Sequence, residues 1–336
     1  MSNRTQARAA AGGLALALVL LGCSTPATSS KDAGTGSSTA TVADADPRPV
    51  TGSAVSALPV TVRSFDGADV TITDTRRIVA ADRYGTLAQT VFGLGLGDRL
   101  VGRSTSAAFP AAKDVPNVTP TGNALNTEAI LALNPTVVLT DTSIGPKAVQ
   151  DQLRAAGIAV VYFDPQRTLA AVAPQIGAVA AALGVPQQGT ELADRTQGEI
   201  EAAKSRVPSG REQLRIAFLY MRGPAITMIA GPGSGADAVI EALGATDAGT
   251  DSGLTQQFSP ITSEALIAAA PDVFLMMTDG LASIGGPEGL EKIPGVAQTP
   301  AGKNKRVVDM ADSTLLGPNT GAVIEALTDA IYPPQT

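Results

Sequence analysis

The apolar and polar positions of the chain repeat one pattern twice, in Leu125–Leu139 and again in Ile261–Leu275. Each stretch begins with an apolar residue, continues through a Thr or Ser, a Glu and an Ala-rich aliphatic run to a Pro, and ends in large apolar residues. The two glutamates, Glu128 and Glu264, hold the same place in the pattern. A pattern that recurs once at domain-sized spacing is typical of two lobes of like fold, and not of a solenoid.

Each repeated stretch predicts a short helix followed by a buried strand. Thr127 and Ser263 are candidate N-caps, and the Glu after each of them lies in the first helical turn, where the helix dipole favours a carboxylate. Pro135 and Pro271 end the two helices because proline cannot continue the backbone hydrogen bonds. The apolar run after each proline has the length and composition of a buried strand.

Strands alternate with helices along the rest of the folded region, which indicates an α/β fold with parallel-type sheets covered on both faces. Residues 58–73 alternate around a turn and predict an edge hairpin. The other predicted strands are 77–81, 100–102, 137–139, 160–163, 215–220, 227–230, 273–276 and 306–309, and the other predicted helices are 85–93, 143–156, 168–183, 236–243 and 320–332.

One long helix, predicted over residues 189–207, carries many charged residues among few apolar ones. Such polarity favours a helix that spans between two lobes over one that lies in a single core. The predicted organisation is therefore an N-terminal α/β lobe over residues 58–187, an interlobe helix over 188–207 and a C-terminal α/β lobe over 208–336.

The start of the chain predicts a signal peptide over residues 1–22. Arg4 and Arg8 precede a short apolar run that cannot span a bilayer as a mature helix. Leu20-Leu-Gly-Cys23 resembles the lipobox of bacterial lipoproteins, which implies that Cys23 is lipidated; an ordinary signal peptide that holds a cysteine is the alternative. Residues 23–57 are rich in small and polar residues, so they predict a flexible linker.

The amino-acid composition excludes several kinds of active site and binding partner. The chain of 336 residues is 44% apolar, which leaves room for two domains with buried cores. It contains no histidine, and this excludes a Ser-His-Asp triad and any histidine ligand to a metal or haem. Cys23 is the one cysteine, and the net charge of −7 without a basic block argues against nucleic acid as a partner. A secreted enzyme on the two-lobe plan would lack the usual bases and nucleophiles, and it stays only as a remote alternative.

A series of short motifs, in order and at matching spacing, adds a family resemblance. The motifs are Arg83-Tyr-Gly-Thr86, Val91–Asp98, Leu139–Ser143, Gly235-Ala-Asp237, Leu275–Thr278, Gly285-Gly286, Thr299–Gly302 and Val308–Ser313. From residue 58 onward the chain resembles the substrate-binding lipoproteins of bacterial ABC importers for haem, siderophores and cobalamin, and above all their actinobacterial haem-binding branch. The resemblance implies a class III periplasmic-binding-protein-like fold and no enzymatic activity. It also implies a lipid anchor at the extracellular face of the cell membrane, haem as the transported ligand and an ABC permease as partner.

In that family, a glutamate on each lobe docks onto arginines of the permease, and Glu128 and Glu264 match these positions. A carboxylate at the start of a helix on each lobe would fix the orientation of the protein on a basic partner. The alternative is that both glutamates are ordinary helix-start charges.

The haem-binding branch grips its ligand between a His of the first lobe and a Tyr of the second, with an Arg beside the Tyr. Tyr220 and Arg222 match the second half of this pattern, and tyrosinate is a known ligand of haem iron. An Arg two positions along a strand lies on the same face as the Tyr, where its charge favours the phenolate. The alternative for Tyr220 is a half-buried strand aromatic that caps the core.

Asn123 departs from the family pattern because it stands where the His is expected, and an amide oxygen is a poor ligand for haem iron. Either haem is held five-coordinate through Tyr220, or the ligand has changed to a ferric siderophore or another iron chelate.

Further candidates surround this predicted site. Arg83 and Tyr84 follow the first sheet strand and would face the cleft as a propionate partner and a reserve ligand, or else form a surface turn. Met276 and Met277 would place a thioether near the iron, or else end a buried strand as core residues. The glycine-rich loop 231–235 precedes a helix, so its amides are a candidate cradle for an anion such as a propionate; a plain strand-to-helix turn is the alternative.

Overall fold

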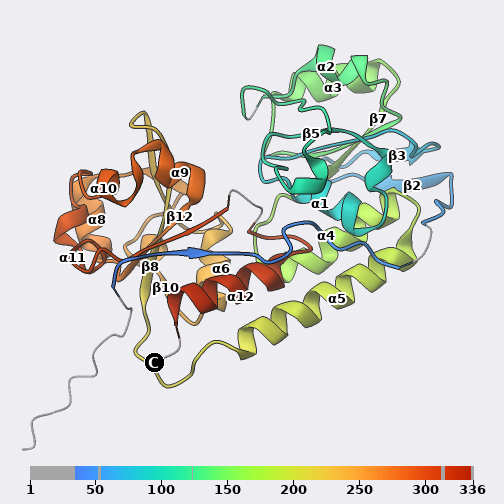
Figure 1. The fold of residues 1–336 in the computed structure, drawn as a ribbon. Coiled ribbons are helices and arrows are strands. Elements are labelled where there is room, and N and C mark those ends of the chain that lie inside the picture. The colour runs from blue at the N-terminus through green and yellow to red at the C-terminus, as the bar shows by residue number, and fades with distance from the viewer. Residues whose placement is uncertain (1–34, 52–53, 123, 312–314, 334–336) are drawn as a thin grey trace, which may run out of the picture. The chain divides into compact units, whose positions relative to one another are not determined.

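The computed structural model describes residues 35–51, 54–122, 124–311 and 315–333 (Figure 1). The predicted signal peptide, Cys23 and Asn123 lie outside these ranges. Within them, no helix is long and apolar enough to cross a membrane. The described elements form two α/β units, each built on its own main sheet.

The N-terminal unit is built on a four-stranded parallel sheet with the order β5-β4-β6-β7. Its strands are β4 (Ile78–Ala81), β5 (Leu100–Arg103), β6 (Val137–Asp141) and β7 (Ala159–Phe163). Every residue of β4 and β6 is buried, as expected for central parallel strands that are covered on both faces.

Helices cover both faces of this sheet because alternate residues of a strand point to opposite sides. Ile78 and Ala80 of β4 belong to one apolar cluster, whereas Val79 and Ala81 belong to another. The first cluster includes residues of α1 (Thr86–Gly93) and α4 (Leu169–Ala182), and the second includes residues of α2 (Thr127–Ala132) and α3 (Lys147–Ala155). The predicted α/β layering is confirmed.

The C-terminal sheet repeats the same strand order. Its parallel core runs β10-β8-β12-β13, formed by β8 (Arg215–Arg222), β10 (Thr246–Asp247), β12 (Val273–Met277) and β13 (Val307–Met310). The strands of the two sequence repeats, β6 and β12, therefore take the same third place in their sheets. Two antiparallel strands extend this sheet, β9 (Ile226–Ala230) and β11 (Phe258–Pro260). The prediction of two lobes of like fold is confirmed.

The remaining elements are short. The predicted edge hairpin is formed by β2 (Val60–Arg63) and β3 (Asp69–Ile72). The short helices of the C-terminal unit are α6 (Ala236–Ala242), α7 (Ala248–Asp251), α8 (Ser263–Ala269), α9 (Thr278–Ser283), α10 (Gly286–Leu290) and α11 (Pro300–Lys303). Single 3-10 turns lie at Gly97–Arg99, Pro110–Ala112 and Val296–Gln298.

The N-caps of the two repeated helices lie one residue earlier than predicted. The side chain of Asn126 accepts a hydrogen bond from the Ala129 amide at 2.9 Å, and that of Thr262 accepts one from the Ala265 amide at 3.1 Å. Thr127 and Ser263, the predicted caps, are instead the first helical residues. A cap needs an extended backbone, which Asn126 and Thr262 have.

The long polar helix is α5 (Pro186–Ser205), and it packs against both α4 and α12 (Thr320–Ile331) (Figure 1). Its buried residues are Gly189, Leu192, Thr196, Ile200 and Ala203, spaced by three or four positions along one face. The helix starts earlier than predicted because Pro186 is well tolerated in the first turn.

The prediction of a flexible linker through residue 57 is wrong for Ser37–Ala40 and for Val50. Ser37–Ala40 form strand β1, which pairs in parallel with β13 at the edge of the C-terminal sheet (Figure 1). Further along, Val50 is buried and its amide donates to the Gly93 carbonyl at 2.8 Å. Pairing at a sheet edge uses backbone groups, so a segment of small polar residues can join it without an apolar pattern.

Candidate functional site

Glu128 and Glu264 lie in the first turns of α2 and α8, and both side chains are exposed. The helix position predicted for them is confirmed. Two exposed carboxylates at equivalent places on two like units remain free to meet a partner.

Tyr220 and Arg222 lie together at the carboxyl end of β8, where the sequence predicted them. Both side chains are half-buried, and the Arg222 guanidinium carbon lies 4.8 Å from the centre of the Tyr220 ring. The Tyr220 ring also contacts Phe258 of β11, which packs edge-on with ring centres 6.0 Å apart. The Arg222 Nη1 also donates to the Met221 carbonyl at 2.9 Å. A cation over an aromatic ring is attractive, so Arg222 and Phe258 together fix the orientation of the phenol.

Tyr84 approaches the same segment from the N-terminal unit. Its hydroxyl lies 3.4 Å from Oε1 of Gln257, the neighbour of Phe258 in the chain. The two tyrosines that the sequence singled out therefore both contact the dipeptide Gln257-Phe258. Burial raises the pKa of the Tyr84 phenol, which disfavours the anionic form that an iron ligand needs.

A buried arginine that was not among the predicted site residues stacks on the ring of Tyr84. The guanidinium carbon of Arg167 lies 4.2 Å from the centre of the Tyr84 ring, and the residue is only 6% exposed. Its Nη1 donates to Thr86 Oγ1 at 2.7 Å, and burial lowers its pKa. Arg167 lies in the loop between β7 and α4, so only the fold brings it to Tyr84.

Two buried aspartates accompany Arg167 at the carboxyl ends of neighbouring strands. Asp82, after β4, accepts hydrogen bonds from the amides of Tyr84, Thr86 and Leu87 at 3.0–3.1 Å. Asp141, the last residue of β6, accepts one from the Ser143 amide at 2.8 Å. Burial, followed by the charge of Asp82, raises the pKa of Asp141 to about 6. This cluster was not predicted from the sequence, although an Asp at the carboxyl end of each of two parallel strands could have indicated it, because such strand ends meet at one sheet edge.

The two units are joined by hydrogen bonds near this cluster. Thr86 Oγ1 donates to the Leu316 carbonyl at 3.0 Å, and Arg167 Nη2 reaches the same oxygen at 3.5 Å. Because Thr86 also accepts from Arg167, the buried arginine is tied at once to the N-terminal unit and to the segment before α12.

Other candidates are placed differently from the predictions. Met276 is fully buried in the apolar core and presents no surface to a ligand, while Met277 is only partly buried. Arg83 is exposed, and its amide donates to Ser143 Oγ at 3.1 Å, as in a turn at the end of the strand. Asn123 lies outside the described residues.

The glycine-rich loop 231–235 does not offer a free cradle to an anion. The amides of Gly233 and Gly235 donate to the two carboxylate oxygens of Asp237, at 2.6 Å and 2.8 Å. The Gly231 amide donates to the Gln257 carbonyl at 3.0 Å. The chain's own carboxylate thus fills the place expected for a propionate, and the loop is a strand-to-helix turn.

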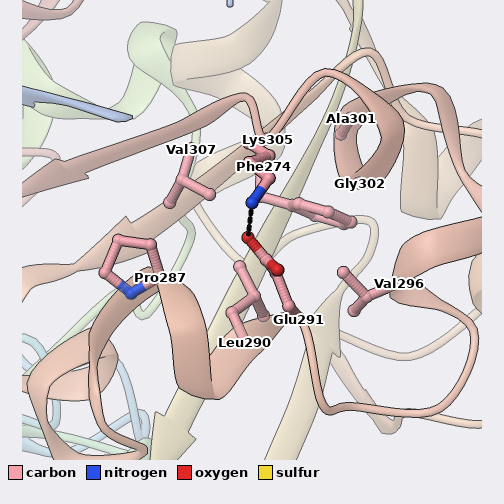
Figure 2. Close-up of a pocket in the computed structure, with 9 residues that line it drawn as sticks. All are labelled: Phe274, Pro287, Leu290, Glu291, Val296, Ala301, Gly302, Lys305 and Val307. Atoms are coloured by element: carbon pink, nitrogen blue, oxygen red, sulfur yellow. Dashed lines mark ion pairs between the residues drawn. The ribbon is translucent and has the colours of Figure 1, made fainter. Parts of the chain in front are cut away.

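A small cavity in the C-terminal unit is too small to hold a ligand. Its volume is about 10 Å³, which is about the space of one water molecule. Figure 2 shows the ion pair between Lys305 Nζ and Glu291 Oε1, at 2.9 Å, among its lining residues. Those residues are Phe274, Pro287, Leu290, Glu291, Val296, Ala301, Gly302, Lys305 and Val307. In the described part of the chain, no group of three or more Cys, Asp or Glu side chains is placed to hold a metal ion.

Comparison with known proteins decides the family. Residues 81–314, most of the chain, match the profile of the family described as periplasmic binding protein. The chain belongs to this family. Periplasmic binding proteins are substrate-binding transport proteins, so this member is a binding protein and not an enzyme.

Solved structures of this family resemble the chain over most of its length. The crystal structure of the heme-binding protein HmuT is 41% identical, covers 90% of this chain and 99% of its own, and superposes with a TM-score of 0.86. The periplasmic heme-binding protein BhuT, in complex with two hemes, is 34% identical over 76% of this chain and 98% of its own, with a TM-score of 0.66. Structures of HmuT variants with alanine in place of a histidine, an arginine or a tyrosine superpose equally well.

A curated relative agrees on the class of periplasmic binding protein. The uncharacterized ABC transporter substrate-binding lipoprotein YvrC of Bacillus subtilis (strain 168) is 26% identical over 284 residues, which is 82% of this chain and 86% of that protein.

Proposed function

We propose that this periplasmic binding protein captures haem and delivers it to the permease of an ABC importer, from a lipid anchor at Cys23 on the extracellular face of the cell membrane. The observation that carries the proposal is the pair of Tyr220 and Arg222 at the carboxyl end of β8. The similarity to solved heme-binding proteins supports it.

Tyr220 is the proposed iron ligand. Its ring contacts both Arg222 and Phe258, so that the hydroxyl is oriented before any ligand arrives. Tyr84 is the less suitable phenol because burial raises its pKa. Arg83, which is exposed beside Tyr84, is proposed as the partner of a propionate.

Glu128 and Glu264 are the proposed contacts to the permease. Their equivalent, exposed positions on the two units support this role, since two charges on different units define an orientation and a single charge does not.

A second candidate ligand is a ferric siderophore or another iron chelate. It is favoured by one observation, namely that the chain contains no histidine to supply a second axial ligand to haem.

Titration of the folded chain with hemin tests the proposal. We expect a shifted Soret band that saturates at one or two equivalents, and its loss or strong weakening in Tyr220→Phe and Arg222→Ala. Tyr162→Phe is the control, because this tyrosine is buried in the core and its hydroxyl has no hydrogen-bond partner among the residues that the structure describes. A hemin shift that is identical in Tyr220→Phe and in the control would refute the role of Tyr220. Tyrosine fluorescence quenched by a ferric chelate, with no response to hemin, would favour the second candidate.

A further inference from the structure

Each of the two repeated helices exposes a large apolar side chain next to its glutamate. In the parts of the chain that the structure describes, the exposed large apolar residues are Val55, Phe65, Leu131, Ile226 and Ile267. Leu131 is 41% exposed and Ile267 is 45% exposed, and both stand three residues after the glutamate of their repeat. Two of the few exposed apolar side chains therefore hold the same position in two copies of one element.

Helix geometry places each of these side chains beside its carboxylate. Residues three apart on a helix are neighbours on one face, so Leu131 adjoins Glu128 and Ile267 adjoins Glu264. The core contact of each helix is made by a different residue, Ile130 or Leu266, whose exposed fraction is zero. Leu131 and Ile267 are thus not the residues that anchor their helices in the core, and more than two fifths of the surface of each is left to water.

The two helices also end alike, so the Glu–Leu pair of one helix and the Glu–Ile pair of the other have the same local backbone around them. Asn134 has a φ of 44° and Ala270 has a φ of 42°, and each directly precedes the proline that ends its repeat. A left-handed residue is uncommon outside glycine, so its presence at both sites shows that the same tight helix end is built twice.

We propose that Leu131 and Ile267 form the apolar half of the permease-docking surface, each fitting an apolar recess beside the basic side chain that pairs with Glu128 or Glu264. This inference rests on the proposed function and adds the partner's chemistry, namely a basic residue next to an apolar pocket, offered twice. Charge complementarity selects this occupant. A second copy of the chain that docked through the same face would bring carboxylate against carboxylate, and an anionic membrane surface would repel the same groups.

The two kinds of side chain have separable effects on binding. Exposed charges accelerate encounter and lose their effect at high salt, whereas burial of aliphatic surface slows dissociation at any salt concentration. We therefore expect the glutamates to govern the association rate and the aliphatic pair to govern the dissociation rate.

The test uses the full chain and the haem ABC permease complex of its own organism, reconstituted in nanodiscs of neutral lipid, with surface plasmon resonance at low and high salt. For the double variant Leu131→Ser/Ile267→Ser, we expect a dissociation rate about tenfold faster at both salt concentrations, with hemin binding unchanged. For Glu128→Gln/Glu264→Gln, we expect a slower association at low salt that converges with the unaltered chain at high salt. Val55→Ser removes an exposed aliphatic side chain outside the repeats and should match the unaltered chain.

The outcomes separate this inference from the function on which it rests. If the glutamate variant loses binding while the serine variant of Leu131 and Ile267 keeps the unaltered dissociation rate, the apolar half is refuted and docking by the carboxylates stands. If neither double variant changes binding to the permease nanodiscs, docking through these helices is itself refuted. Equal binding to nanodiscs without the permease would refute the choice of partner.

Discussion

Gly321 in the first turn of α12 lies where α12 packs closely against the long helix α5. A Cβ atom at Gly321 would lie 2.7 Å from the backbone carbon of Glu199 and 2.9 Å from its carbonyl oxygen. Backbone atoms of a packed helix cannot rotate away, so Gly321→Ala must push α5 and α12 apart. The substitution therefore loosens the contact that joins the last helix to the helix between the two units.

The expected magnitude follows from two opposing effects. Forcing one extra methyl into a packed contact costs about 1–3 kcal/mol, and replacing glycine by alanine in a helix returns at most about 1 kcal/mol. We expect a net loss of about 1–2 kcal/mol of unfolding free energy, and a melting temperature lower by about 2–3 °C.

Gly198 provides the matched control, because it lies on α5 itself, one residue before Glu199. A Cβ atom added at Gly198 would have no atom within 4 Å, so Gly198→Ala should raise the unfolding free energy by about 0.5–1 kcal/mol. Thermal and urea unfolding, followed by circular dichroism, measure both variants. An unchanged or higher melting temperature for Gly321→Ala would refute the close approach of the two helices.

Three further predictions concern stability. Ala270→Gly relieves a left-handed alanine and should stabilise the chain by up to about 1 kcal/mol in urea unfolding; a loss would contradict the backbone conformation. Asn126→Ala removes the N-cap of α2 and should lower the unfolding free energy by about 1 kcal/mol, while Thr127→Ala should lower it clearly less. A larger loss in Thr127→Ala than in Asn126→Ala would contradict this and would indicate that Thr127 is the cap, as the sequence predicted. The folded-state pKa of Asp141, raised to about 6, means that the folded protein holds its proton more tightly than the unfolded chain. Stability should therefore fall as the pH rises from about 4 through 6, and Asp141→Asn should flatten this fall in melting curves recorded across that range; an equal slope in the variant would contradict the burial of its charge.

The sequence predicted the elements whose signal is local and apolar. The alternation of strands and helices and the doubled stretch around Glu128 and Glu264 were enough to predict two α/β units, because buried strands and amphipathic helices each carry their own periodicity. Strand β1 was missed since pairing at a sheet edge depends on backbone groups and leaves no pattern in side chains.

In the candidate site, too, contacts between near neighbours in the chain were predicted, and contacts that only the fold produces were missed. Tyr220 and Arg222 were placed together correctly because a spacing of two along a strand fixes the face on which both lie. The stacking of Arg167 on Tyr84 was missed because those residues are far apart in the chain and only the fold brings them into contact. For the loop at 231–235 the sequence left an anion cradle and a plain strand-to-helix turn open, and it could not decide between them because it does not show that Asp237 turns its carboxylate back onto the loop amides.

Haem capture through Tyr220 is the central claim, and the resonance Raman spectrum of the hemin-loaded chain tests it most directly. We expect vibrations of an iron-bound phenolate that disappear in Tyr220→Phe and persist in Tyr84→Phe and Tyr162→Phe. A phenolate signature that survives Tyr220→Phe and disappears in Tyr84→Phe, or a hemin complex of the unaltered chain without any such signature, would contradict the claim.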